Sequence, residues 1–140
     1  MLGLKLDHAT IRTTRLEETL AFYQEYLGLS AGWRPSLGSG GAWLYAQGSD
    51  YPQLHVIETK TDLGRGGMID HIAFRGVGLV DYLDKLRSGG QPFKADRIPE
   101  TPYTQVLVSD PNGIILETNF EEQIDDALLQ SDLVLERLAR

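Results

Sequence analysis

An internal repeat limits the folds that this sequence can adopt. The segment Asp7-His8-Ala9-Thr10-Ile11-Arg12 returns 63 residues later, in related form, as Asp70-His71-Ile72-Ala73-Phe74-Arg75. The same offset relates two pairs of leucines in the segments that follow, Leu16 with Leu79 and Leu20 with Leu83. Self-similarity at a fixed spacing indicates a duplicated unit of secondary structure. We therefore predict a single domain over residues 1–140 that contains two modules, at about residues 4–59 and 68–120.

The first module is expected to contain one strand, one helix and three further strands. Alternation of apolar and polar residues predicts a strand over residues 4–13, and Thr14-Arg15-Leu16-Glu17 has the pattern of a capping box that opens a helix. Gly28 is expected to end this helix. Three short strands are predicted over residues 30–34, 42–47 and 53–59.

The second module repeats this order after a glycine-rich linker predicted over residues 59–67. A strand over residues 68–75, a helix over residues 79–87 and three strands are expected, the strands over residues 93–98, 103–109 and 114–119. Asp110-Pro111-Asn112-Gly113 is a strong turn signal between the last two strands. An amphipathic helix is predicted over about residues 121–138, with Ile124, Leu128, Leu135 and Leu138 on one face.

Together these patterns predict an α+β fold in which two tandem βαβββ modules form a curved mixed sheet around a central cavity, with a C-terminal helix added. The chain has no cysteine, which suits a reducing compartment and excludes thiolate zinc and iron-sulfur sites. Its net charge of -7 would repel nucleic acid and anionic lipid. No apolar run approaches the roughly 20 residues that span a bilayer. We expect a soluble cytoplasmic protein that binds neither nucleic acid nor membranes.

Three histidines and one glutamate are candidate metal ligands: His8, His55, His71 and Glu117. Because residues two apart in a strand share a face, all four are expected on the concave faces of the sheets, opposite the helices. A buried carboxylate among neutral imidazoles is costly without a counter-charge, and a divalent cation would supply it. His55 depends on the register of one short strand, and a slip of one residue would bring Glu58 to the cavity instead.

Other residues have a functional and a structural interpretation. Arg12 and Arg75 stand four residues beyond a histidine, where they could steer an anionic substrate or simply be solvated strand ends. Trp43, Tyr45 and Tyr103 could stack on a planar substrate or belong to the core. Gly38-Ser39-Gly40-Gly41 is not a phosphate loop, because the lysine and the following helix are missing.

Several of these segments resemble the vicinal oxygen chelate superfamily, which includes glyoxalase I, methylmalonyl-CoA epimerase, fosfomycin-resistance thiol transferases, extradiol dioxygenases and bleomycin-binding proteins. The resemblance extends over about residues 4–120. It is carried by Asp7-His8-Ala9-Thr10, residues 20–23 and 27–29, residues 70–74, and Asp110-Pro111-Asn112-Gly113 leading to Leu116-Glu117. It implies that His8, His71 and Glu117 are metal ligands, and that His55 stands at a fourth position where members differ.

No single subfamily matches at every position. Glyoxalases resemble this chain but have glutamate where His55 stands, and the epimerases have glutamine there. Extradiol dioxygenases have an acid/base histidine at a similar position and a tyrosine ten residues before the glutamate, where this chain has Leu107. The thiol transferases share Thr10 and also expect a tyrosine at the position of Leu107.

The resemblance implies a metal-dependent enzyme that acts on a small oxygen-rich metabolite by Lewis-acid and enolate chemistry, as a glyoxalase-like lyase or isomerase. The ion would be Mn, Ni, Co, Zn or Fe(II), and the catalytic residues would be His55, as fourth ligand or proton carrier, and Glu117. An Fe(II) ring-cleaving dioxygenase and a non-catalytic drug-binding protein are the alternatives. Members usually form homodimers, and the apolar face of the terminal helix offers a surface for one.

Overall fold

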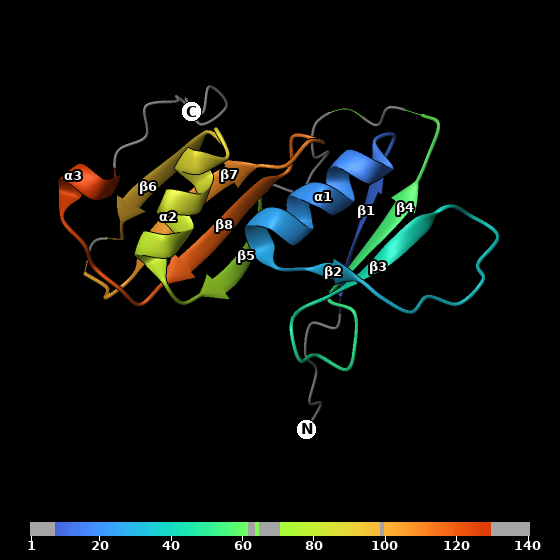
Figure 1. The fold of residues 1–140 in the computed structure, drawn as a ribbon, viewed down its shortest axis with the longest axis horizontal. Helices are drawn as coiled ribbons and strands as arrows, with labels where there is room; N and C mark the ends of the chain where they lie inside the picture. Colours follow the sequence, from blue (N-terminus) through green and yellow to red (C-terminus); the bar gives the residue numbers. More distant parts are fainter. Residues whose placement is uncertain (1–7, 62–63, 65–70, 99, 130–140) are drawn as a thin grey trace. The chain divides into compact units, whose positions relative to one another are not determined.

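Both halves of the chain have the predicted order of strand, helix and three strands (Figure 1). The computed structural model describes residues 8–61, 64, 71–98 and 100–129. The chain divides into two compact units, Met1–Gly64 and Arg65–Arg140, here called unit 1 and unit 2. Each unit contains one four-stranded mixed sheet with a helix packed on it, so the predicted α+β fold with tandem βαβββ modules is confirmed.

Unit 1 contains the sheet that carries His55. Its elements are β1 (Ala9–Thr13), α1 (Leu16–Leu27), β2 (Ser30–Ala31), β3 (Gly41–Tyr45) and β4 (Leu54–Glu58). The strand order is β1-β4-β3-β2, with β1 parallel to β4 and the other pairs antiparallel. The strand β2 is shorter than the predicted 30–34, because only Ser30 and Ala31 pair with β3.

Unit 2 repeats this topology with longer strands. Its elements are β5 (His71–Gly76), α2 (Leu79–Ser88), β6 (Phe93–Arg97), β7 (Thr104–Ser109), β8 (Ile115–Phe120) and α3 (Asp126–Leu129). The strand order is β5-β8-β7-β6, again with one parallel pair at β5 and β8. Among the residues that the structure describes, no helix is long and apolar enough to cross a membrane.

The register of the two parallel pairs reproduces the sequence repeat. Thr10 lies opposite His55 in unit 1, and Ala73 lies opposite Glu117 in unit 2. Since Thr10 and Ala73 each follow a repeat histidine by two residues, His55 and Glu117 occupy equivalent places. The duplication therefore extends to the candidate ligands on the neighbouring strands.

The core of each unit lies between its helix and one face of its sheet. In unit 1 the helix side chains Phe22 and Tyr23 are buried, as are Ile11, Leu44, Leu54 and Val56 from the sheet. In unit 2 the buried residues are Leu79, Leu83 and Leu86 from α2 and Val106, Val108, Leu116 and Phe120 from the sheet. Each buried side chain of this size contributes about 1.5–3 kcal/mol relative to an exposed one. The opposite faces, which carry the histidines, are left outside these cores.

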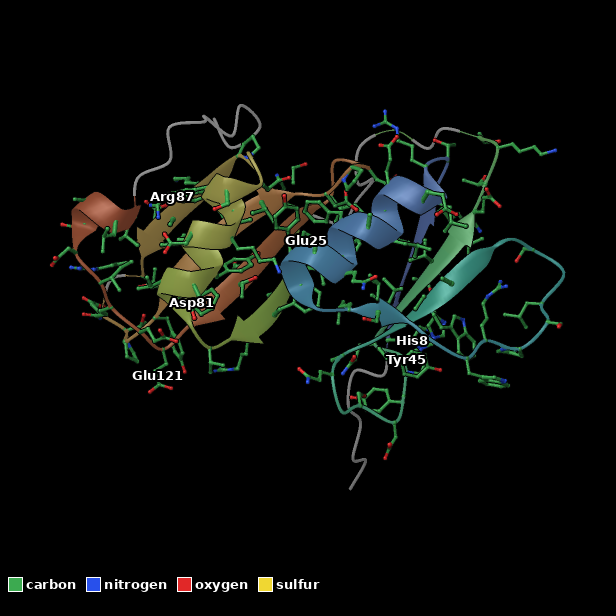
Figure 2. The ribbon with its side chains drawn as sticks, in the orientation of Figure 1. His8, Glu25, Tyr45, Asp81, Arg87 and Glu121 are labelled. Carbon is green, nitrogen blue, oxygen red and sulfur yellow. The ribbon has the colours of Figure 1, made fainter. Side chains whose placement is uncertain are left out.

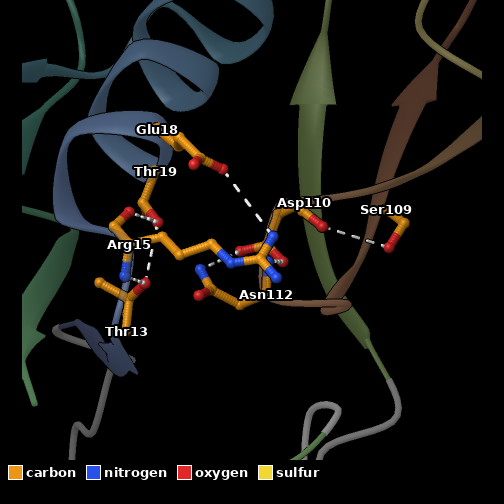
Figure 3. Close-up of polar contacts among 7 residues, drawn as sticks. All are labelled: Thr13, Arg15, Glu18, Thr19, Ser109, Asp110 and Asn112. Atoms are coloured by element: carbon orange, nitrogen blue, oxygen red, sulfur yellow. Dashed lines mark hydrogen bonds and ion pairs between the residues drawn. The ribbon is translucent and has the colours of Figure 1, made fainter. Parts of the chain in front are cut away.

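The start of α1 differs from the predicted capping box. The N-cap is Arg15 and not Thr14, and its side chain makes no capping hydrogen bond. Instead, the Thr13 hydroxyl accepts a hydrogen bond from the Arg15 N–H at 2.9 Å, and the Thr19 hydroxyl donates to the Arg15 carbonyl at 2.7 Å (Figure 3). The capping-box prediction was wrong because a threonine one residue earlier satisfies the backbone at this turn.

The C-terminal segment also differs from the sequence prediction. Residues 121–125 are not helical, and α3 begins at Asp126 instead of residue 121. Leu129 is buried, whereas Leu128, which was placed on the apolar face, is 46% exposed. The predicted helical residues 130–138, the first strand residues 4–7 and 68–70 and most of the glycine-rich linker lie outside the described residues.

A distant carboxylate caps the start of α2. Glu122 accepts hydrogen bonds from the N–H groups of Gly78 at 2.6 Å and Leu79 at 3.0 Å. Helix N-termini leave such donors unsatisfied and favour negative charge, so this carboxylate both completes the hydrogen bonds and interacts favourably with the helix dipole. It also fastens the segment after β8 to the second helix.

Replacing Glu122 by alanine is expected to lower the free energy of unfolding by about 2 kcal/mol. The reason is the loss of two charge-assisted hydrogen bonds from the part-buried N–H groups of Gly78 and Leu79. Urea denaturation followed by circular dichroism measures this. The control is Glu121→Ala, which removes the same charge from an exposed neighbour and should change stability by about 0.5 kcal/mol or less. Equal effects of the two substitutions would contradict the cap.

Candidate metal centre

In unit 2, one histidine and one glutamate face a common point. His71 begins β5, and Glu117 lies diagonally across from it on β8. The His71 Nε2 and Glu117 Oε2 atoms are 3.6 Å apart, and the two side chains are 42% and 17% exposed. Two donor atoms bound to one ion at about 2.1 Å lie about 3.0–3.4 Å apart. This pair therefore fits two ligands of one ion after a shift of a few tenths of an ångström.

Asn119 orients the carboxylate of Glu117. Its side-chain Nδ2 donates a hydrogen bond of 2.6 Å to Glu117 Oε1, so Oε2 is the oxygen that faces His71. Residues 117 and 119 share one face of β8, and Asn119 lies opposite Arg75 on β5. Hydrogen bonds of this kind hold metal-binding carboxylates in position. Asn119 was not among the candidate residues predicted from the sequence, although its spacing of two residues from Glu117 places both on one face of the strand.

In unit 1, His55 lies in a stack of three rings. His55 is opposite Trp43 across the β3–β4 pair, and their rings are 4.3 Å apart with an angle of 10° between planes. The His8 ring stacks on His55 at 3.8 Å and 15°. Leu54 and Val56 are buried on the other face, so the one-residue slip that would have turned His55 outward does not occur, and Glu58 is exposed.

The stack limits how His8 and His55 can share an ion. An imidazole nitrogen binds a metal through a lone pair that lies in the plane of its ring. Two rings that are nearly parallel and 3.8 Å apart direct their lone pairs along separate parallel planes. Only one of the two can therefore ligate a given ion without first leaving the stack. His8 is exposed, whereas His55 is half-buried beside Trp43, so His8 is the ring that moves more easily.

Aromatic residues continue this surface beyond Trp43. Trp33 contacts Trp43 edge to face, with centroids 6.1 Å apart, and remains 73% exposed. The Tyr45 hydroxyl donates a hydrogen bond of 2.7 Å to the Trp33 carbonyl and so holds the segment that carries Trp33. His8 and Tyr45 lie at the same end of the unit 1 sheet (Figure 2). Trp43 and Tyr45 are half-buried. Trp33 falls within the strand predicted over residues 30–34 and was not identified from the sequence as a functional residue, whereas β2 ends at Ala31.

Arg75 is fixed on the His71 face of unit 2. Its Nη1 donates a hydrogen bond of 3.0 Å to the Tyr103 hydroxyl, and its guanidinium carbon lies 5.1 Å from the centre of the Tyr103 ring. The hydrogen bond with Tyr103 raises the pKa of Arg75 above its usual value, with a smaller contribution from the charge of Glu121. Contact with Tyr103 thus fixes the position of the positively charged Arg75 guanidinium on this face.

The turn before β8 also sets the position of Glu117. Asp110 Oδ1 accepts a hydrogen bond of 2.8 Å from the N–H group of Asn112 (Figure 3). It accepts another of 2.8 Å from the N–H group of Ile114. The Gly113 N–H donates to the Asp110 carbonyl, which closes the turn predicted from the sequence. Because the turn fixes the register between β7 and β8, it places Leu107 opposite Glu117.

Each unit thus brings two of the four candidate ligands together, His8 with His55 in unit 1 and His71 with Glu117 in unit 2. No group of three or more His, Asp or Glu side chains within the described residues is close enough to hold a metal ion. The donors are nitrogen and oxygen only, the chemistry that Mn, Co, Ni, Zn and Fe(II) accept.

Comparisons with known proteins agree with this fold. The sequence model of the Glyoxalase/Bleomycin resistance protein/Dioxygenase superfamily matches residues 5–118. A glyoxalase family protein from Bacillus anthracis is 21% identical, with a TM-score of 0.70 over 86% of this chain and 97% of that chain. The fosfomycin resistance protein FosX from Listeria monocytogenes is 20% identical, with a TM-score of 0.64 over 84% and 91%. No curated protein matches the sequence. At these identities the structural likeness shows the fold alone.

Proposed function

The chain belongs to the Glyoxalase/Bleomycin resistance protein/Dioxygenase superfamily, and from this premise we propose that it is a metal-dependent lyase or isomerase acting on a small oxygen-rich metabolite. His8, His71 and Glu117 would hold a divalent ion, and His55 would carry a proton. A bound ion would supply the positive charge that polarises adjacent substrate oxygens and stabilises an enolate. We expect the enzyme to work as a cytoplasmic homodimer.

The observation that supports this proposal most directly is the His71–Glu117 pair. Its 3.6 Å separation, the low exposure of Glu117 and the hydrogen bond from Asn119 together describe a carboxylate prepared for a ligand role. Without a cation, the hydrogen bond from Asn119 would replace only part of the hydration that the Glu117 carboxylate loses at this place. A divalent ion removes this cost.

The role of His55 follows from the three-ring stack. With His8 as the ligand, His55 would keep its contact with Trp43 and stay beside the site, where an imidazole suits general acid–base work. A set of three protein ligands also leaves positions open for two vicinal substrate oxygens. Four protein ligands would leave fewer positions for the substrate oxygens.

The ring-cleaving dioxygenase alternative is less well supported. Leu107 lies opposite Glu117, at the place where the dioxygenases have a tyrosine, and it offers no hydroxyl group. The exposed Trp33 beside Trp43 instead favours, as second candidate, a protein that binds a flat aromatic molecule without catalysis.

Metal titration of chelator-treated protein tests the proposal. The variant Trp33→Phe leaves Trp43 as the only tryptophan, since the chain has two. Ni(II) or Co(II) bound beside the His8–His55 stack should quench Trp43 fluorescence and, at 100 times Kd, add about 2.7 kcal/mol to the free energy of unfolding. Mg(II) at the same concentration is the control. Conversion of a hemithioacetal, or epimerisation of a chiral acid, that returns only with the added metal would support a lyase or isomerase.

Three results would contradict the proposal or its fluorescence readout. Oxygen uptake with Fe(II) and a catechol would establish the dioxygenase alternative. Tight binding of aromatic molecules by a protein that neither binds nor is stabilised by any of these ions would establish the binding protein. Quenching that also occurs with Mg(II) would show that the fluorescence change does not come from ligation at the histidines.

A further inference from the structure

The position of Arg75 indicates the kind of substrate that this site would take. We propose that Arg75 binds a carboxylate at the far end of the substrate while the reacting oxygens lie at His71 and Glu117. This inference rests on the proposed function, because it assumes that the substrate approaches the His71–Glu117 pair. It adds a substrate class, an elongated carboxylic acid.

The positions on the sheet place Arg75 on the correct face. Along β5, His71, Ala73 and Arg75 are exposed, while Ile72 and Phe74 between them are half-buried. Ala73 is opposite Glu117, and Arg75 is opposite Asn119. Arg75 is thus two residues, or about 7 Å along the strands, beyond the Glu117 level. A substrate lying along β8 would reach both groups.

Arg75 is held in place before any ligand arrives. The hydrogen bond to the Tyr103 hydroxyl and the contact with the Tyr103 ring restrain a side chain that would otherwise lose considerable rotamer freedom on binding. Only Nη1 is engaged, and the other guanidinium N–H groups meet no acceptor among the residues that the structure describes. A guanidinium edge with two parallel donors matches a carboxylate.

Charge on this face favours a carboxylate over a phosphate or phosphonate. Lys94, which lies on the same face because it is opposite Leu107, forms an ion pair of 3.0 Å with Asp96. Arg75 is a single guanidinium that already has the charge of Glu121 nearby, so it balances one added negative charge better than two. In a chain with a net charge of -7, a local fixed cation is also what an anionic substrate needs in order to approach.

A buried acceptor between the two ends supports a ligand at this place. Asn119 Oδ1 is inaccessible to solvent, and no described residue donates a hydrogen bond to it. Its Nδ2 is already committed to Glu117. A buried acceptor left unsatisfied is costly, so we expect a small shift of the Asn119 side chain to let a substrate hydroxyl group or a water donate to Oδ1.

The test measures how strongly a tail carboxylate improves binding to the Mn(II)-loaded protein. The probes are acetohydroxamate, which offers only the two oxygens, and the monohydroxamates of succinic, adipic and suberic acid, each compared with its neutral terminal amide. Isothermal titration gives the Kd of each probe. We expect the terminal carboxylate of one chain length to lower Kd by about 10- to 100-fold relative to the amide.

Variants assign this gain to Arg75. Arg75→Met should abolish it, Arg75→Lys should keep part of it, and Tyr103→Phe should reduce it while leaving the ring. The matched control is Arg87→Met, which removes an arginine that also lies over an aromatic ring, at 5.5 Å from Phe93, but on α2. Arg87→Met should retain the full gain and leave the Kd of acetohydroxamate unchanged.

The outcomes separate this inference from the proposed function. If acetohydroxamate binds but the terminal carboxylate gives no gain, or the gain survives in Arg75→Met, the inference is overturned while metal binding stands. A larger gain with a terminal phosphonate than with a carboxylate would overturn the assignment to a carboxylic acid. If no probe binds and Mn(II) does not stabilise the protein, the proposed function fails, and the inference fails with it.

Discussion

Replacing Glu117 by alanine is expected to abolish the rise in Tm that Ni(II), Co(II) or Mn(II) produces in the unaltered protein. Glu117 is the only carboxylate in the candidate ligand set, and its oxygen faces His71 at 3.6 Å. Without it, an ion would be held by neutral imidazoles alone and would lose its charge balance. Thermal denaturation in the presence of each ion measures the effect, and isothermal titration gives the Kd.

Two further variants make this result specific. Asn119→Ala removes the hydrogen bond that orients Glu117 and should weaken metal binding by about 10- to 100-fold, a smaller effect than the loss of Glu117 itself. Glu58→Ala removes an exposed carboxylate at the end of β4 and should leave metal binding unchanged. A full metal-dependent shift in Glu117→Ala, or an equal loss in Glu58→Ala, would refute the ligand assignment.

The sequence predicted the parts of this fold that depend on periodicity. The 63-residue repeat led to two modules, and strand alternation led to the faces of His8, His55, His71 and Glu117. These features are local in the chain, because side-chain direction follows from counting residues along a strand. The register of β4 was the weakest step, and burial of both Leu54 and Val56 shows why it held: a slip would have exposed them.

The arrangement of rings around His55 could not be predicted in the same way. The stack of His55 on Trp43 depends on the register between β3 and β4, which places these two residues opposite each other. The length of the connection between the two strands does not determine that register. The sequence therefore left His55 open as a ligand or a proton carrier. The near-parallel rings of His8 and His55 favour a single ligand from this pair, because the ring planes decide which nitrogens can meet at one ion.

Capping contacts were missed for a related reason. The capping-box pattern counted residues forward from Thr14, whereas Thr13 and Thr19 complete the turn through hydrogen bonds with Arg15. At α2 the capping group, Glu122, is 44 residues away from Gly78. Interactions over such separations depend on the finished fold and leave no periodic signal.

The segment Gly38-Ser39-Gly40-Gly41 was excluded as a phosphate loop, and its last residue, Gly41, begins β3. Gly41 has a φ of 141°, which side chains rarely allow, and a Cβ built on it would lie 2.1 Å from the carbonyl oxygen of Val56. Glycine thus lets β3 approach β4 closely at the point where their pairing begins. The same pairing places Trp43 opposite His55.

Replacing Gly41 by alanine is expected to destabilise the protein by about 3 kcal/mol or more, because backbone strain and a clash with a main-chain carbonyl act together. The matched control is Gly48→Ala, where φ is 76° but the new Cβ meets nothing within 4 Å. That substitution should cost only the strain, about 1–2 kcal/mol. Urea denaturation measures both.

Since Gly41→Ala also disturbs the strand next to His55, it should reduce the metal-induced quenching of Trp43 at metal concentrations where Gly48→Ala retains it. Equal stability of the two variants would mean that β3 and β4 do not approach as closely as their pairing indicates.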